Sequence, residues 1–155
     1  MPDTLTQDCL VATADAMTAM RLAGIIDAQI PANRIVWQWE ASIEKSDLSK
    51  RVVVSPAGAV VQDRLNHCVE YKVPLTVAFQ CDSGGSRIGA NLAVNARDAV
   101  MVRLAKVDRE TFWTLAALHR IETTPGEGPD QGVLGSSESW YATLSINLIL
   151  RYPIK

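Results

Sequence analysis

The sequence predicts an α+β fold: a mainly antiparallel sheet with an N-terminal helix and a central helix packed on one face, and a long C-terminal strand. Two observations lead to this fold class. Two long segments alternate apolar and polar residues with a period of two, as strands do, and two others repeat small apolar residues at steps of three and four, as helices do. With 155 residues, 48% of them hydrophobic and 21% charged, the chain is expected to form a single domain over residues 1–155.

Two helices are predicted from these repeats. The first runs from Thr4 to Gly24, because Thr4 and Gln7 have the T-x-x-Q spacing of a capping box and a glycine commonly ends a helix. The second runs from Ile88 to Val107 and gathers alanine and valine residues on one face, which favours close packing on a sheet. Asp108 is expected to cap a further turn or short helix.

Three shorter strands are predicted outside the two long alternating segments. The run Arg34–Ala41 would place Trp37 and Trp39 on one strand face. The valine-rich run Arg51–Pro56 would end at its proline, and residues 117–123 can form a short strand.

The two long alternating segments are the main strands of the predicted sheet. In residues 69–81, Pro74 cannot donate a ladder hydrogen bond, which predicts an edge position or a bulge. In residues 140–152 the even positions are apolar, and Ile149 is the exception to the alternation. At about 3.3 Å per residue this last strand would run about 40 Å, against a radius of gyration of about 15 Å for a domain of this size. It must therefore bend around the core or reach beyond it.

Two loops are predicted from residues that break regular structure. The turn Asp82–Arg87 is rich in glycine and precedes a helix, but it lacks the P-loop pattern and Asp82 would repel an anion, so phosphate binding is not expected. The segment Thr124–Ser139 combines glycine, proline and serine and predicts a long exposed loop without regular structure. Loops of this length are usually functional or disordered.

Charge and composition argue against several classes of function. Fifteen basic and seventeen acidic residues give a net charge of −2, so there is no basic field with which to coat nucleic acid. No apolar run approaches the roughly 20 residues that span a bilayer. The start "MPDTLTQDCL" lacks the basic and apolar regions of a signal peptide, so we expect a cytoplasmic product with no membrane partner.

The residues that carry chemistry do not form a recognisable motif. His67 and His119 lack an activating context, and the carboxylates are scattered over separate predicted elements. Cys9, Cys68 and Cys81 fit neither a disulfide framework nor a CxxC metal ribbon. The alternative is a small metal- or ligand-binding enzyme subunit, with a metal held by the two histidines, Cys68 and Cys81. Adjacent strand residues point to opposite faces, however, so His67 and Cys68 could not easily share an ion. The sequence therefore predicts no enzyme, no cofactor and no metal.

The order of four segments carries a resemblance to a known family. These are "RVVVSPAG" at Arg51–Gly58, the strand Tyr71–Phe79, the helix Ala90–Leu104 and the strand Trp140–Tyr152. Together they resemble the tail-terminator, or tail-completion, proteins of tailed bacteriophages. In that family an N-terminal helix precedes a strand ending in a proline turn, a long "Y-x-V-x-L-x-V" strand, a helix and a C-terminal "L-x-L-x-Y-R" strand.

The resemblance implies a structural virion protein that forms a homohexameric ring at the end of the tail tube, terminates tail assembly and provides the surface on which the head docks. The implied partners are further copies of the chain, the tail tube protein and a head-side connector or neck protein, with DNA passing through the lumen without specific binding. The implied location is the virion, after assembly in the host cytoplasm. The long loop at 124–139 and the closing order Arg151 then Tyr152 depart from the family pattern, and they leave open a head-closure or neck connector.

Partner contacts are expected on two loops and on the polar face of the last strand. Ring subunits make heterologous contacts, and a long strand can cross such a contact by pairing or packing. The loops are Asp82–Arg87 and Gly126–Ser137. The candidate interface residues are Asp82, Ser83, Arg87, Glu127, Asp130, Tyr141, Thr143, Ser145, Asn147 and Arg151.

Overall fold

The computed structural model of the protein describes residues 2–39, 50–82, 87–105, 112–126, 130–131 and 139–154. The predicted α+β class is confirmed, with two helices and a mostly antiparallel sheet. A short 3-10 turn at Ala32–Arg34 precedes the first strand. The elements follow one another as α1 (Pro2–Leu22), β1 (Ile35–Trp37), β2 (Arg51–Pro56), β3 (Val61–Arg64), β4 (Cys68–Asp82), α2 (Arg87–Ala105), β5 (Leu118–Pro125), β6 (Asp130–Gln131) and β7 (Ser139–Pro153).

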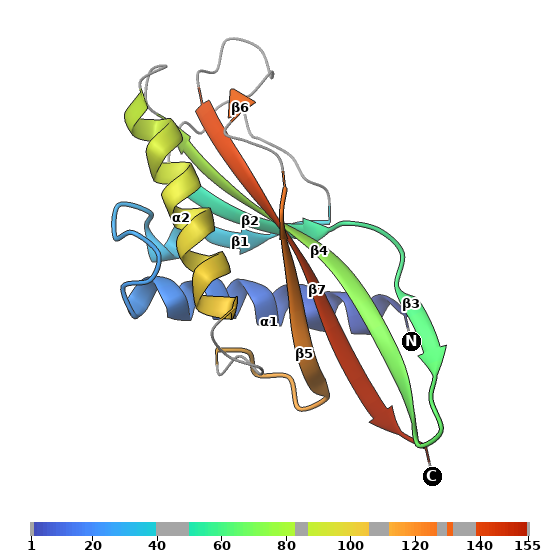
Figure 1. Ribbon diagram of the computed structural model, residues 1–155. Helices are drawn as coiled ribbons and strands as arrows, with labels where there is room; N and C mark the ends of the chain where they lie inside the picture. The colour runs from blue at the N-terminus through green and yellow to red at the C-terminus, as the bar shows by residue number, and fades with distance from the viewer. Residues whose placement is uncertain are drawn as a thin grey trace.

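The strands form one sheet in the order β1-β2-β4-β7-β5 (Figure 1). β1 and β2 are parallel, and the other pairs are antiparallel. β3 continues along β4 on the side of β2, and β6 continues along β7 on the side of β5. The chain therefore ends in a strand that lies inside the sheet, between β4 and β5.

The two long strands pair with each other over their whole length. The register runs from Cys68 opposite Pro153 to Asp82 opposite Ser139, so every residue of the two fifteen-residue strands has a partner in the other. Figure 1 shows this ribbon continuing past α2 and β2, with β3 beside it and the C-terminus at its far end. We call this distal part, made of β3 and residues 68–72 and 149–154, the arm. The long last strand thus reaches beyond the helical layer.

Pro74 was predicted to mark an edge position or a bulge. β4 as a whole is a central strand between β2 and β7, but Pro74 itself has no ladder partner in β2 or β3 and so has a local edge position. The pairing of β4 with β2 ends at Leu75, and its pairing with β3 begins at Lys72. Pro74 lies in the gap between these two neighbours, where its carbonyl accepts a hydrogen bond from the Ala57 N–H at 3.0 Å. In an extended strand the nitrogen and oxygen of one residue face the same side, so the missing N–H points into this local gap and breaks no ladder bond.

Both helices pack on one face of the sheet, as predicted. A single hydrophobic cluster joins buried residues of the two helices with alternate residues of the strands, including Leu10, Met17, Ala93, Val100, Val54, Phe79, Leu144 and Leu148. Small residues such as Ala93 and Ala96, both buried, let α2 approach the strands closely. Neither of the described helices is long and apolar enough to cross a membrane.

The end of α1 was predicted correctly, and its start was not. The helix begins at Pro2, so Thr4 and Gln7 lie inside it rather than forming a capping box. Proline suits the first helical turn because its fixed φ fits the helix and its missing N–H is not needed there. Gly24 has φ of 83° and ends the helix in a Schellman motif, with Gly24 N–H donating to Arg21 O and Ile25 N–H to Met20 O.

Two other predictions need correction. β1 stops at Trp37, so Trp39 lies outside the strand, although the two indole rings contact edge to face at 5.6 Å. The segment 124–139 is not free of regular structure, because β5 extends to Pro125 and β6 pairs with β7. The further turn or short helix expected after Asp108 lies mostly outside the described residues. In the described part, Trp113 Nε1 donates a 3.0 Å hydrogen bond to Thr13 Oγ1 of α1.

Candidate interaction surface

The candidate surface is the sheet face opposite the two helices, which we call the outer face. In β7 it is formed by the odd-numbered residues, because the even-numbered ones enter the core. Four predicted interface residues, Tyr141, Thr143, Ser145 and Asn147, lie on it and are half-buried. The outer face divides along β7 into three regions of different chemistry.

The first region lies near the start of β7 and is withdrawn from solvent. Arg51 and Gln80 are opposite each other in β2 and β4, and Arg51 Nε donates to Gln80 Oε1 at 2.7 Å. Both side chains are buried, with exposed fractions of 4% and 2%. Gln80 in turn lies opposite Tyr141. A buried guanidinium needs such partners because an unpaired buried charge is costly.

The middle region is a row of hydroxyl side chains across four strands. Ser55 lies opposite Thr76, Thr76 opposite Ser145, and Ser145 opposite Thr124. Exposure increases along the row, from buried Ser55 to exposed Thr124. The row is uncharged, so covering it with another protein surface costs less desolvation than covering ion pairs.

The third region spans the arm and the adjoining part of β5, and it carries paired charges. Arg151 Nε donates to Glu70 Oε2 at 2.8 Å, and this hydrogen bond holds the pKa of Glu70 below its usual value. Glu122 forms an ion pair with Lys72 at 3.5 Å and a longer one with Arg120 at 4.0 Å. These charges satisfy one another within the chain.

Ile149, the exception in the alternating pattern, lies on the outer face and is nevertheless 1% exposed. Its direct neighbours in the register are Lys72 on β4 and Arg120 on β5. The ion pair between Lys72 and Glu122 joins the two strands that flank β7, so it must pass over β7 beside Ile149. The aliphatic stems of these long side chains account for its cover.

The structure distributes the remaining predicted interface residues over the whole length of the sheet. Asp82 ends β4, Arg87 begins α2 and Asp130 begins β6 opposite Tyr141, so these three lie near the start of β7. Arg151 lies at the other end, on the arm. Ser83 and Glu127 fall outside the described residues. The predicted set is therefore not one compact patch.

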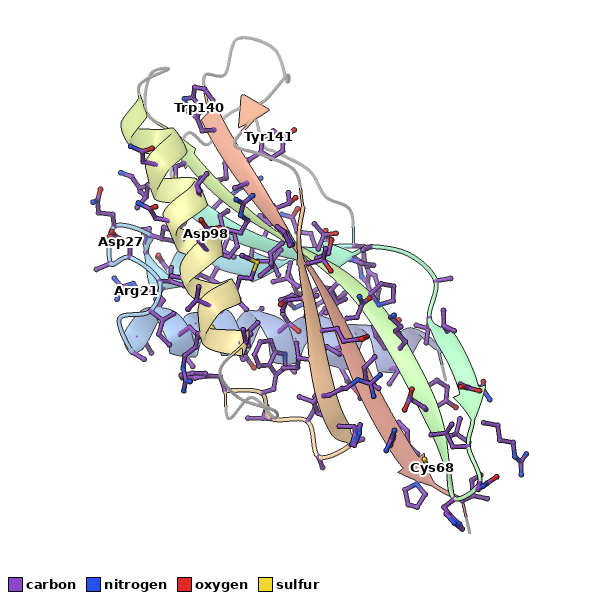
Figure 2. All side chains as sticks on the ribbon, in the orientation of Figure 1. Arg21, Asp27, Cys68, Asp98, Trp140 and Tyr141 are labelled. Atoms are coloured by element: carbon purple, nitrogen blue, oxygen red, sulfur yellow. The ribbon has the colours of Figure 1, made fainter. Side chains whose placement is uncertain are left out.

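The cysteine and histidine residues of the metal alternative do not lie together, because the two cysteines are at opposite ends of β4. Cys68 begins β4 and Cys81 lies near its end, and Figure 2 shows Cys68 at the far end of the ribbon from Trp140, which is opposite Cys81. His67 precedes Cys68 in the turn, and His119 lies on β5. Within the described ranges, no three His, Cys, Asp or Glu side chains are grouped so that they could hold a metal ion.

Sequence reasoning missed two features of the surface. The hydroxyl row depends on strand register, which no residue in the row reveals by itself. The second is a shallow groove of about 420 Å³ between α2 and the segment after α1, lined by Ile25, Asp98, Ala99, Val102 and Arg103. Asp98 and the neighbouring loop residue Asp27 are labelled in Figure 2. The half-exposed Val102, which lies outside the apolar stripe of α2, is the only sequence signal for it.

Comparison with known proteins leaves the chain without a family assignment: no family model matches it, and no curated protein matches it at significant similarity.

Proposed function

We propose that this protein is a structural virion component that forms a ring at the end of a phage tail tube, terminates tail assembly and provides a docking surface for the head. The observation that carries the proposal is the full-length pairing of β4 with β7, which extends the arm beyond the helix-covered core. A subunit of a ring must present different surfaces to its two neighbours, and an arm at one end of the molecule supplies such asymmetry. The order of elements agrees with the resemblance to tail-terminator proteins.

The outer face further supports a contact between subunits in its middle region. At the start of β7 the Arg51–Gln80 pair is already buried, and at the arm Glu70 and Lys72 are already paired with Arg151 and Glu122. A partner covering those ion pairs would have to desolvate them, which offsets much of the gain from contact. The hydroxyl row around Ser145 carries no charge and is partly exposed, so it is where we place the contact.

The test is the mass of the purified chain in solution, measured by light scattering over a range of concentrations, with negative-stain images of the same samples. A ring of uniform size supports the proposal. A protein that stays monomeric at all concentrations, and that also fails to bind the ends of purified tail tubes from a phage carrying this chain, overturns it. Binding to head-side connectors instead of tubes would assign the protein to the neck.

A pair of matched variants locates the contact. Ser145→Arg places a charge in the middle of the outer face, whereas Asn95→Arg places the same side chain on the exposed side of α2. We expect Ser145→Arg to shift the protein towards monomer while its circular dichroism and thermal midpoint stay near those of Asn95→Arg. Equal assembly of the two variants would show that the middle of the outer face is not the contact.

A further inference from the structure

We draw no further inference here: the strongest candidate, the shallow groove between α2 and the segment after α1 with Ile25, Ala99 and Val102 in its lining, carries nothing, because nothing in the structure shows what covers it.

Discussion

Ile149 gives the sharpest test of the outer face, because sequence and structure assign it different surroundings. The alternating pattern places it on the polar face, where a single exposed isoleucine is unremarkable. The structure places it on the same face but at 1% exposure, between Lys72 and Arg120 in the register, and we infer that the ion pair of Lys72 with Glu122 covers it. The loss of stability in Ile149→Ala therefore shows whether this side chain is buried or lies at the surface.

The expected magnitude follows from this burial. Truncation of a buried isoleucine to alanine typically costs about 2–5 kcal/mol, through lost transfer free energy and the cavity left behind. Because the cover consists of flexible side chains that can close over the gap, we expect the lower half of that range, about 2–3 kcal/mol. A surface substitution would change the free energy of unfolding by only about 0.5 kcal/mol.

The assay is urea unfolding of the wild-type chain and Ile149→Ala, under conditions in which both are in the same oligomeric state. Ser145→Ala is the matched control, because Ser145 lies on the same face of the same strand and is only half-buried. We expect the control to lose less than about 1 kcal/mol. A loss below about 1 kcal/mol for Ile149→Ala, with an unchanged m-value, would refute the argument that the ion pair covers an apolar site.

Three further predictions concern the rest of the fold. Gly126→Ala should cost about 1–3 kcal/mol, because a Cβ there would collide with β7, whereas Gly58→Ala, where a Cβ meets only ordinary contact at 3.7 Å, should be tolerated; thermal unfolding compares the two. Burial, with a smaller effect of neighbouring acid, raises the pKa of the Cys9 thiol from 9.0 to about 12, so the unfolded chain loses this proton first and stability should fall between about pH 9 and 12. Three pKa units correspond to about 4 kcal/mol of stability. Unfolding curves measured over a pH series test this assignment. It is contradicted if the stability of Cys9→Ala falls with rising alkaline pH as steeply as that of the wild-type chain. Trp113→Phe should cost about 1–3 kcal/mol of stability by leaving the Thr13 hydroxyl unpaired. In a double-mutant cycle, the same substitution should cost much less in a Thr13→Val background, where that hydroxyl is absent.

The fold class could be predicted because it depends on local patterns. The period-two alternation of residues 140–152 records one buried and one outer face, and this held for β7 at every even position from Ala142 to Leu150. Gly24 was identifiable as a helix end because only a residue without a Cβ adopts a positive φ easily. These signals act within a few residues, so the sequence displays them directly.

The sequence could not show features that depend on a neighbouring strand. Pro74 indicated a local edge, but not that β4 is otherwise central, because the gap beside the proline is created by the ends of β2 and β3. β6 was missed because two residues paired with β7 leave no periodic signal. For the same reason the sequence could not show that Asp82 and Asp130 lie beside the start of β7, at the opposite end from Arg151.

The chemistry of the outer face follows from what each part of β7 meets across the sheet. Near Tyr141 the neighbouring strands supply a buried arginine–glutamine pair, and near Arg151 they supply charges that neutralise one another. The arginine–glutamine pair is already withdrawn from solvent, and covering the partly exposed ion pairs would cost desolvation, so a partner gains little at either end. The hydroxyl row around Ser145, with Thr143 and Asn147 beside it on β7, combines partial exposure with the absence of charge. If the protein assembles through its outer face, the contact should therefore respond to a charge at Ser145 more strongly than to removal of the Glu70–Arg151 pair. Ser145→Arg compared with Glu70→Gln in the same light-scattering experiment measures that difference, and a greater loss of assembly in Glu70→Gln would move the contact to the arm.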